Sequence, residues 1–525
     1  MTRSRWGRRL ARLAGMLVVG LMVSSSAPPA FAAGPTILGA GSTWSQIAIE
    51  QWRVDVNRLG LSVNYSGVGS TTGRQFFAAG NVDFAVSEIP FQPDDPPNSR
   101  GFAYLPIVAG GTSMMYNLKT SSGSQIRDLK LSPATIALIF TGKITNWNDS
   151  RITADYGKQL SNQSIRLLVR SDGSGTSAQF SAYLAATQPA AWRAFTSACG
   201  VPDTFTSFWP YGKANCLPNA VGQKGSDGIA NYISNPGLGV GTIGYLEAGY
   251  AVARNFPVVG VKNASGHYAI PTAVSVATAL KHATLNADST QRLGDVYTAP
   301  EDNAYPISSY SYMIVPTDSS ITADKGAVLG KFIIYFACTG QQEAQRLGYS
   351  PLPKELVSFA FDAEQKIPGA PNPPPIDAAH CANPTVNGTF NWNDPGSLTG
   401  TDLSGKASDN GGNGNHTPGS TGTPTATLPP GATLPPGATL PPGATLPPGS
   451  TLGPGGIVIQ TSTPATIKKG GLLVLKNLAD QQIAGAQPPG TLPMVVLALF
   501  ILAMVFGPLV LRIRGRRSQD APPPP

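Results

Sequence analysis

Apolar and polar positions alternate along residues 36–381 in a way that predicts both strands and helices. Short β-rich apolar runs lie at 61–65, 165–169 and 312–315, and turns rich in Gly, Pro and Asn separate them from their neighbours. The stretches 45–58 and 178–186 instead place apolar residues at helical spacing. Interleaved strands and helices are typical of α/β organisation, and the length of this region suffices for two lobes.

Two apolar segments depart from this pattern and predict export and anchoring. Five arginines precede an apolar run at 13–23, and Ala30-Phe31-Ala32 follows it, which is typical of a signal peptide cleaved near Ala33. A retained signal anchor is the alternative, but the run is too short to cross a bilayer. The stretch 492–511 has the length of a membrane span, and four arginines follow it. The positive-inside rule then leaves the intervening chain outside the cell. A buried core helix is the alternative for this stretch.

The chain between the globular region and the second apolar segment has the composition of a spacer. Gly, Asn, Ser, Thr and Pro dominate it, and the hexapeptide ATLPPG repeats between Ala426 and Gly449. Double prolines favour polyproline II, so 423–456 is predicted to form a semi-rigid stalk of about 100 Å at about 3.1 Å per residue. No element is predicted for 457–486. The predicted organisation is a signal peptide (1–33), a globular domain (34–383), a disordered linker (384–491), a membrane helix (492–511) and a cytoplasmic tail (512–525).

Charge and cysteine content narrow the class of protein. The formal net charge is +8, but the signal peptide carries five of these charges and the tail three, so the exposed part is neutral. A nucleic-acid partner is therefore not expected. Four cysteines form an even set in an exported protein and none lies in a CxxC, which favours two disulfides over a metal site. Of three connectivities, sequence proximity favours Cys199 with Cys216 and Cys338 with Cys381. The four histidines are scattered, and neither a metal nor a cofactor is expected.

Four turns share one design, in which a predicted strand is followed by glycine and hydroxyl residues and then by an amphipathic helix. Helix N-termini present backbone amides without helical partners, so each turn is a potential anion site. Taken singly, each turn is also an ordinary helix cap. The four segments are GAGSTW at 39–44, GVGSTTG at 67–73, RSDGSGTS at 170–177 and GSDG at 225–228.

Together with the single Arg170, these turns favour a site for a buried oxyanion. Such a site needs many donors and little excess positive charge, because unpaired buried cations are costly. Known catalytic motifs do not fit: GxxxxGK[ST] is missing, and Asp172 stands where GxSxG requires its first glycine. Because neither a placed nucleophile nor a metal site is visible, no catalysis is expected.

The segments GAGSTW, NYSGVGSTTG, NVDFAVSE and VRSDGSGTS, in this order, resemble the phosphate-binding subunit of high-affinity phosphate ABC transporters. Further similarity in FTGKITNWND, KGSDGIANYI, GTIGYLEAGYA, AYPISSYSYMIV and LGYSPLPKELV extends the resemblance over 39–357. The resemblance implies a two-lobe, periplasmic-binding-protein-like (type II) fold that closes about a hinge over dehydrated phosphate. Lobe one is expected at about 34–112 and 300–383, and lobe two at about 113–299.

The resemblance also implies which residues contact phosphate. Thr43 and Trp44 would offer backbone and hydroxyl donors, Trp44 standing where the family usually has Phe, and Ser70 would donate from the second turn. Arg170 would supply the cationic contact, and Asp172 would hold its guanidinium. The third helix start would contribute Ser174, Gly175 and Thr176.

Glu88 departs from the family pattern, which has Asp at this position. A carboxylate there accepts the proton of phosphate and repels a fully ionised anion such as sulfate. Glutamate keeps this chemistry but adds a methylene, so its carboxylate must fold back or the pocket must be wider. Alternatively, Glu88 points to solvent and accepts nothing.

The resemblance favours a monomeric, membrane-anchored receptor that captures inorganic phosphate outside the cell and delivers it to an ABC permease. One alternative is a surface or sensory paralogue with the same fold and weakened or lost phosphate binding, motivated by Glu88 and the unusual stalk. Another is a phosphate-ester hydrolase that uses the same turns to hold its product.

Overall fold

The computed structural model describes residues 34–393, 398, 400–403, 450–452 and 458–460. The chain divides into two compact units, 1–406 and 407–525. In the second unit, β14 (Ser450–Leu452) and β15 (Val458–Gln460) form an antiparallel pair. The predicted linker therefore includes a short strand at 450–452, inside the segment predicted to form the stalk.

The first unit contains an eight-stranded mixed sheet in the order β2-β1-β3-β13-β4-β8-β6-β7. β1 pairs in parallel with β2 and β3, and β6 pairs in parallel with β7 and β8. The antiparallel strands β13 and β4 lie between these two groups. The strands are β1 Ile37–Gly41, β2 Val63–Gly67, β3 Phe84–Ser87, β4 Phe102–Asn117, β6 Arg166–Arg170, β7 Val221–Gln223, β8 Thr242–Glu247 and β13 Ser308–Pro316.

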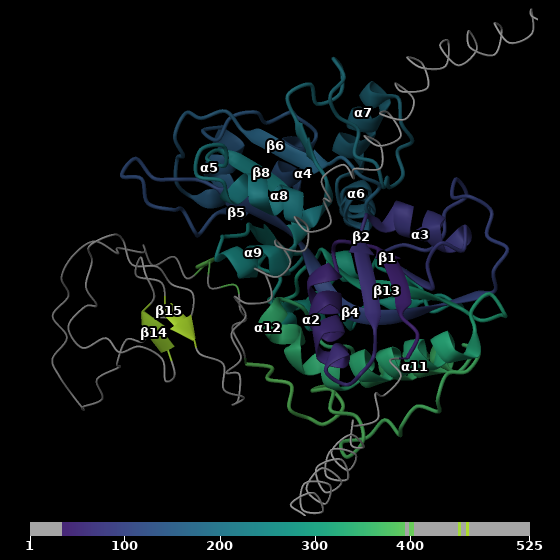
Figure 1. Cartoon of the computed structure of the whole chain (residues 1–525). Helices are drawn as coiled ribbons and strands as arrows, with labels where there is room; N and C mark the ends of the chain where they lie inside the picture. Colours follow the sequence, from purple (N-terminus) through teal and green to yellow (C-terminus); the bar gives the residue numbers. More distant parts are fainter. Residues whose placement is uncertain (1–33, 394–397, 399, 404–449, 453–457, 461–525) are drawn as a thin grey trace, which may run out of the picture. The chain divides into compact units, whose positions relative to one another are not determined.

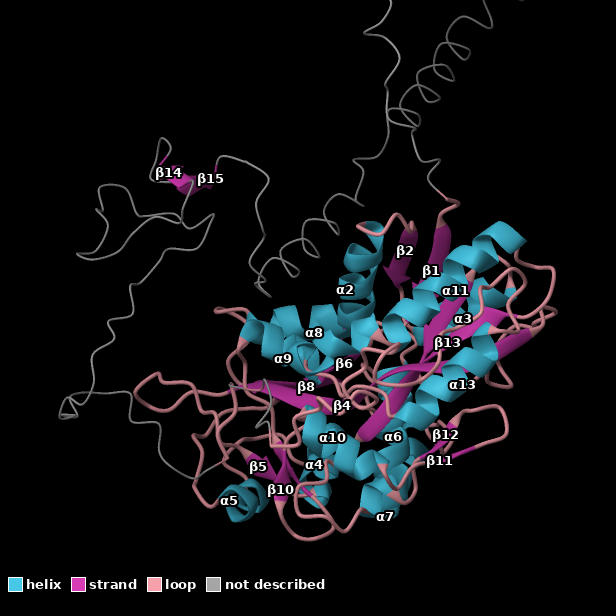
Figure 2. Ribbon diagram, turned by 90° about the horizontal axis from the view of Figure 1, so that it is seen from below, coloured by secondary structure: helices cyan, strands magenta, loops and turns pink. Residues whose placement is uncertain are grey.

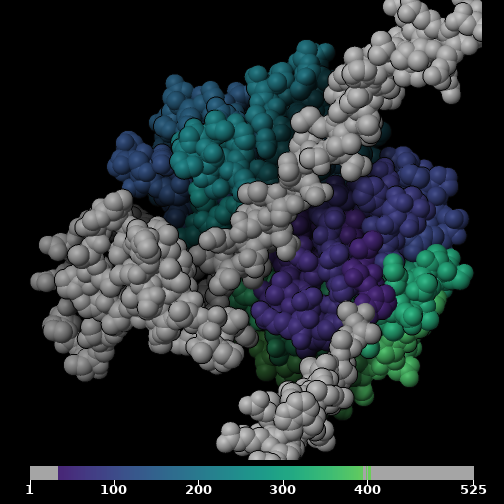
Figure 3. Space-filling view, in the orientation of Figure 1, coloured from purple at the N-terminus to yellow at the C-terminus, as the bar shows by residue number. Residues whose placement is uncertain are grey.

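The long strand β4 joins two half-sheets. Its residues 102–111 pair with β13, and its residues 112–117 pair with β8. We call β2, β1, β3 and β13 the first half-sheet and β8, β6 and β7 the second half-sheet. They occupy different regions of the domain, with β4 between them (Figures 1 and 2). In the space-filling view, purple N-terminal residues and teal residues from the middle of the chain lie on separate parts of the surface (Figure 3).

Twelve α-helices and two 3-10 helices occur in the described part of the first unit. Helices α3, α6 and α8 begin earlier than predicted, so residues of the glycine-rich turns form their first helical turns. The helices are α2 Gln46–Asn57, α3 Ser70–Ala78, α4 Pro133–Phe140, α5 Ser150–Tyr156, α6 Gly175–Thr187, α7 Pro189–Cys199, α8 Gly225–Ser234, α9 Ala248–Arg254, α10 Ala273–Leu280, α11 Ala323–Ala337, α12 Ala344–Leu347, α13 Lys354–Glu364, η1 Val296–Thr298 and η2 Thr339–Glu343.

Small strand pairs complete the domain. β5 (Lys130–Leu131), β9 (Gly260–Lys262) and β10 (Tyr268–Ala269) form a three-stranded sheet. β11 (Thr284–Leu285) and β12 (Gln291–Arg292) form a hairpin. The predicted strands at 165–169 and 312–315 and the predicted helices at 45–58 and 178–186 are confirmed to within a few residues. The strand predicted at 61–65 is also confirmed to within two residues, as β2.

Two hydrophobic clusters lie beside the sheet and follow its division only in part. β4 contributes Leu105 and Val108 to the first cluster and Met114 and Tyr116 to the second. α10 and the chain after it pack with the first cluster, because Val276, Ala279, Leu280, Leu293 and Val296 belong to it. The first cluster also contains Leu168, Ile229 and Leu246, which belong to the second half-sheet and to α8. Cluster membership therefore does not locate the lobe boundary predicted at 299/300, which stays a prediction.

A C-terminal segment beyond the predicted domain end at 383 also packs on the domain. Phe390 contacts the α10 residues Ala273 and Val274, and Leu398 belongs to the first cluster. Farther along, the Thr401 hydroxyl accepts a hydrogen bond from the amide of Val258 at 2.9 Å. We call residues 366–393, 398 and 400–403 the C-terminal strap. The predicted boundary at 383 therefore falls inside the strap.

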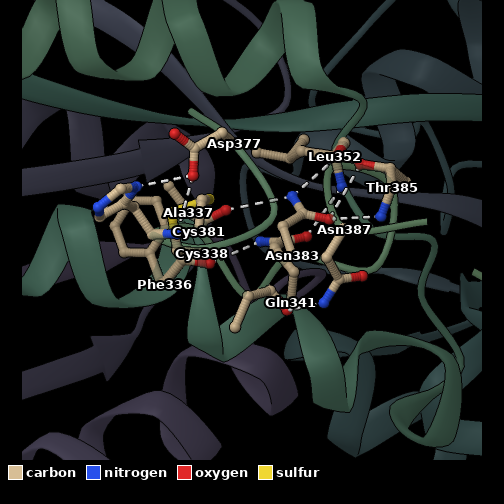
Figure 4. Close-up of a disulfide and its surroundings, with 12 residues drawn as sticks. Phe336, Ala337, Cys338, Gln341, Leu352, Asp377, Cys381, Asn383, Thr385 and Asn387 are labelled. Atoms are coloured by element: carbon tan, nitrogen blue, oxygen red, sulfur yellow. Dashed lines mark hydrogen bonds and ion pairs between the residues drawn. A yellow bond between two sulfur atoms is a disulfide. The ribbon is translucent and has the colours of Figure 1, made fainter. Parts of the chain in front are cut away.

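Two disulfides are present, Cys199–Cys216 and Cys338–Cys381, the pairing that sequence proximity favoured. The second joins the end of α11 to the strap. Beside it, the Asn383 amide donates to the carbonyl oxygens of Ala337 and Leu352 at 3.2 and 2.9 Å. Thr385 also donates to the Leu352 carbonyl, at 2.6 Å (Figure 4). The disulfide and these polar contacts together fix the strap to the domain.

Replacing Cys338 and Cys381 together with serine is expected to lower the free energy of unfolding by about 4 kcal/mol. The disulfide spans 43 residues, and a crosslink of that span restricts the unfolded chain strongly. Denaturant unfolding of the full-length chain under oxidising conditions measures the loss. Removal of Cys199 and Cys216, which span 17 residues, is the control and should cost less, about 3 kcal/mol. An unchanged stability in the first variant would contradict this role of the strap.

Several predictions fall outside the described residues. These are the signal peptide (1–33), the ATLPPG repeats, the membrane helix (492–511) and the cytoplasmic tail (512–525). Among the residues that the structure describes, no helix is both long and apolar enough to span a membrane.

Candidate functional site

Four turns that were predicted to bind an anion follow the carboxyl ends of parallel strands. They connect β1 to α2, β2 to α3, β6 to α6 and β7 to α8. In open α/β sheets, ligands bind beyond these strand ends. Two of the turns belong to the first half-sheet and two to the second, so a site at this edge draws residues from both.

The turns touch one another across the two half-sheets. The amide of Gly175 donates to the Ser70 hydroxyl at 3.1 Å, and the amide of Thr71 donates to the Gly173 carbonyl at 3.2 Å. On the other side, the amide of Ser226 donates to the Thr43 hydroxyl at 3.0 Å. We call the place where these turns meet the cradle.

Arg170 and Asp172 form a buried ion pair at the cradle. Arg170 Nε donates to Asp172 Oδ1 at 2.7 Å, and its Nη2 donates to Oδ2. The remaining nitrogen, Nη1, lies 3.3 Å from the Thr176 hydroxyl and 3.5 Å from the Ser226 hydroxyl. Asp172 therefore holds two guanidinium nitrogens and leaves the third directed at cradle hydroxyls, as predicted for its role.

The electrostatics of this pair keep both members charged. Burial favours the neutral form of each, but the opposite charge outweighs it. The pKa of Asp172 accordingly lies below its usual value, and that of Arg170 lies above its usual value. The amide of Gly225 adds a hydrogen bond to Asp172 Oδ1 at 3.0 Å. The ion pair therefore places a guanidinium group in the cradle while the summed charge of Arg170 and Asp172 stays near zero.

Glu88 points into the cradle and is only 1% exposed, which excludes the solvent-facing alternative. Its Oε2 accepts from the Ser70 hydroxyl and its Oε1 from the Ser311 hydroxyl, both at 2.9 Å. A Cβ placed on Gly175 would lie 2.1 Å from Oε2, so the carboxylate faces the start of α6 directly. Burial raises the pKa of Glu88, against the lowering effects of hydrogen bonds and of Arg170. Glu88 is therefore the carboxylate of the cradle that is bound by hydroxyl groups, whereas Asp172 is paired with Arg170.

The remaining predicted residues divide between cradle and core. Thr43, Ser174 and Thr176 are buried, and Ser174 caps α6 by accepting from the amide of Ser177 at 3.2 Å. The Trp44 indole packs instead against Tyr349 in the first hydrophobic cluster, with ring centroids 5.7 Å apart. The Trp44 amide donates to the Ser42 hydroxyl at 2.9 Å. The Trp44 side chain thus lies in the hydrophobic core, and only the backbone of Trp44 belongs to the turn.

Several residues near the cradle were not singled out from the sequence. Ser311 lies on β13, far along the chain from the turns, within the segment AYPISSYSYMIV that carries part of the resemblance, but it was not chosen as a ligand. Ser226 belongs to the fourth turn, which was recognised, but it was not chosen as a ligand. The Tyr245 hydroxyl shares a hydrogen bond of 2.7 Å with the Ser177 hydroxyl, in which either oxygen can be the donor. It also accepts a hydrogen bond from the backbone amide of Arg170 at 3.1 Å. The contacts of Ser311 with Glu88 and of Tyr245 with Arg170 follow only from the three-dimensional arrangement.

A cavity of about 350 Å³ adjoins the cradle at Glu88. Residues of α6 form one wall, and the chain after β3 and the region of the β11–β12 hairpin form others. Its lining includes Pro90, Ala178, Gln179, Phe205, Gln291 and Tyr297. The side-chain amide of Gln179 donates a hydrogen bond to the backbone carbonyl of Glu88 at 2.7 Å, and this contact joins α6 to the end of β3.

The chemistry of the cradle suits an oxyanion better than a metal or a covalent reaction. Hydroxyls, helix-start amides and a neutralised arginine are donors, and Glu88 is an acceptor. Among the described residues, no group of three or more His, Cys, Asp or Glu is arranged to hold a metal ion. A bound anion that carries a proton would complement both the donors and Glu88.

Comparisons with known proteins agree with this chemistry. Residues 26–339 match the family described as a PBP superfamily domain. The chain is 32% identical over 323 residues to the Phosphate-binding protein PstS of Xylella fastidiosa (strain Temecula1), covering 61% of this chain and 82% of that protein. It is 30% identical over 330 residues to the Phosphate-binding protein PstS of Pasteurella multocida, covering 61% and 88%.

Among solved structures, the chain resembles the ancestral soluble variant of the Human Phosphate Binding Protein. The TM-score is 0.50 at 20% sequence identity, and the match covers 65% of this chain and 100% of that one. At this identity the similarity concerns the fold alone.

Proposed function

Because this chain belongs to the PBP superfamily and, within it, to the PstS-like phosphate-binding proteins, we propose that it is an extracytoplasmic receptor that captures inorganic phosphate and delivers it to an ABC-type importer. The curated relatives are binding proteins, in keeping with the expectation that this chain catalyses no reaction. Phosphate would lie in the cradle and touch both half-sheets.

The observation that carries this proposal is the convergence of Arg170, Glu88 and three helix starts on one buried point. Hydrogen bonds to charged groups contribute about 1.5–3 kcal/mol each, whereas micromolar affinity needs a net of about 8 kcal/mol. Several donors in the cradle therefore suffice, even after the cost of ordering the binding site. The proposed ligands are Thr43, the Trp44 backbone, Ser70, Glu88, Arg170, Ser174, Gly175 and Thr176, with Asp172 supporting Arg170.

We propose that the two half-sheets are the cores of two lobes that close over phosphate. β4 passes between them at 111/112, and the chain passes back between β8 in the second half-sheet and β13 in the first. Contacts such as Gly175 to Ser70 join the lobes only when they are closed. A hinge at these crossings would open the cradle for exchange with solvent and with a permease.

The ends of the chain complete the proposal. A cleaved signal peptide (1–33) would direct export, and a helix at 492–511 would anchor the protein with its tail (512–525) inside the cell. The part of the predicted linker (384–491) that follows the C-terminal strap would let a monomeric domain reach a permease in the same membrane. Its proline-rich composition is suited to a spacer.

Phosphate is expected to raise the melting temperature of the full-length chain by about 5 °C at a thousandfold excess over its Kd. The stabilisation, about 4 kcal/mol, arises because phosphate binds the folded state and not the unfolded one. Differential scanning fluorimetry measures the shift, and titration calorimetry measures the Kd. Sulfate at equal concentration should shift the melting temperature much less, because Glu88 has no proton to accept from it.

This titration also tests the alternatives. A surface or sensory paralogue that has lost phosphate binding would respond to neither anion. Turnover of a chromogenic phosphate ester would identify a hydrolase instead. Either result would overturn the proposed receptor function.

A further inference from the structure

The two oxygens of Glu88 contact different elements. Oε2 faces Ser70, the first residue of α3, while Oε1 faces Ser311 on β13, each at 2.9 Å. Ser311 Oγ also lies 2.9 Å from Ser45 Oγ, so it belongs to a chain of buried hydroxyls. All three serines are at most 1% exposed. The carboxylate therefore spans the distance between one residue of the cradle and one residue of the neighbouring strand.

The backbone of Glu88 is fixed independently of its side chain. Its carbonyl accepts from Gln179 at 2.7 Å and from Gln291 at 3.4 Å. The preceding residue, Ser87, pairs with Tyr312 in the β3–β13 ladder. Since the main chain cannot follow the carboxylate, the contacts at its two oxygens decide where it points.

We propose that Ser311 is a positioning residue that sets anion specificity in the cradle. By donating to Oε1 it holds the carboxylate folded back, so that Oε2 stays between Ser70 and Gly175 as an ionised acceptor for a protonated oxyanion. This inference rests on the proposed function. It means that β13, which is not one of the four turns, contributes to the recognition of the anion by orienting the Glu88 carboxylate.

The length of glutamate is matched to this arrangement. An aspartate carboxylate at position 88 would be withdrawn by about 1.5 Å, the length of one C–C bond. With the backbone fixed, a carboxylate so withdrawn cannot span Ser70 and Ser311 at once. Ser311 therefore acts through the longer side chain, and its contribution depends on Glu88.

The hydrogen bond from Ser311 also controls when Glu88 is charged. Burial raises the pKa of Glu88, while hydrogen bonds from Ser42, Ser311 and Ser70 and the charge of Arg170 lower it. Removing Ser311 removes one of the lowering effects, so the pKa rises further. A protonated Glu88 donates instead of accepting and no longer repels an anion without a proton. Sulfate binding should therefore appear as the pH falls through the pKa of Glu88, and at a higher pH without Ser311.

The other titratable groups that face Glu88 keep their charge state while Glu88 changes its own. Tyr65, Tyr312 and Tyr349 are buried, and burial raises the pKa of each well above its usual value, so they stay neutral. Arg170 stays charged because Asp172 raises its pKa against the effect of burial. A pH-dependent change in sulfate binding thus reports on Glu88.

The test compares the full-length wild-type chain with Ser311→Ala, Glu88→Asp and the double variant. Phosphate and sulfate are titrated by calorimetry from about pH 5 to about pH 8. Ser311→Ala should weaken phosphate binding about 10-fold and move the onset of sulfate binding up by about one pH unit. In the Glu88→Asp background, the same change should alter phosphate affinity less than about 3-fold, because coupled residues are not additive.

Ser309→Ala is the matched control. Ser309 lies on the same strand, is 2% exposed, and its hydroxyl has no hydrogen-bond partner among the described residues. This variant should leave the sulfate onset unchanged. An equal shift in Ser309→Ala, or equal losses from Ser311→Ala in both backgrounds, would overturn the inference alone. A wild-type chain that does not bind phosphate would overturn the proposed function and this inference with it.

Discussion

Arg170→Ala is expected to weaken phosphate binding by about 1000-fold, equivalent to about 4 kcal/mol. Arg170 is 1% exposed and brings the cation of the cradle within reach of the Thr176 and Ser226 hydroxyls. Its removal takes away charged hydrogen bonds to phosphate. It also leaves the Asp172 carboxylate buried and unpaired, where it repels an anion. Titration calorimetry on the full-length chain measures the loss.

Arg170→Ala is also expected to lower the free energy of unfolding, so its effect on phosphate binding must be separated from its effect on folding. The double variant Arg170→Ala/Asp172→Ala removes the unpaired carboxylate and should recover much of the melting temperature without recovering phosphate affinity. Arg166→Ala is the control on the same strand, because Arg166 is exposed and donates to the Leu238 carbonyl at 2.9 Å. Near wild-type affinity in the double variant would refute the role of Arg170.

The parts of the site that could be predicted from sequence are local. A turn such as 170–177 carries its own signal, because glycine, hydroxyl and acidic residues at fixed spacing define a strand end and a helix start. Arg170 and Asp172 are two residues apart, and their pairing follows from the strand ending there. The convergence of the four turns was suggested by their shared design, and the structure brings them together.

The residues that sequence analysis missed are distant in the chain. Ser311 contacts Glu88 across 223 positions, and such a contact depends on the register of β13 against β3. Alternation within one segment indicates which face of the sheet a residue occupies, but it does not identify which residue of a distant strand lies beside it. The boundary predicted at 383 differs from the packing for a related reason. The strap is rich in Asn, Pro and Gly and looks like linker, yet the disulfide at Cys381 and the contact of Phe390 hold it on the domain.

Gly175→Ala provides a second test of the cradle, because it adds a single methyl group at the centre of the proposed site. The new Cβ would lie 2.1 Å from Glu88 Oε2 and 2.8 Å from the Ser70 hydroxyl. Real Cβ atoms do not approach other atoms so closely, so Glu88 and Ser70 must move and α6 must separate from them. We expect phosphate affinity to fall at least about 100-fold, since two ligands and the closed contact between Gly175 and Ser70 are lost together.

The matched control for this variant is Gly228→Ala, in the helix start of the fourth turn. A Cβ on Gly228 meets its nearest neighbour, the Cβ of Gln223, at 3.6 Å, which is an ordinary contact. Neither glycine has a positive φ, so alanine is compatible with both backbones, and the contacts of the added methyl group are what distinguish the two variants. Calorimetry should therefore find near wild-type phosphate affinity in Gly228→Ala and a loss of at least about 100-fold in Gly175→Ala. If Gly175→Ala still unfolds in a single cooperative transition, loss of binding in that variant alone locates the anion at the start of α6. Equal affinities would place it elsewhere.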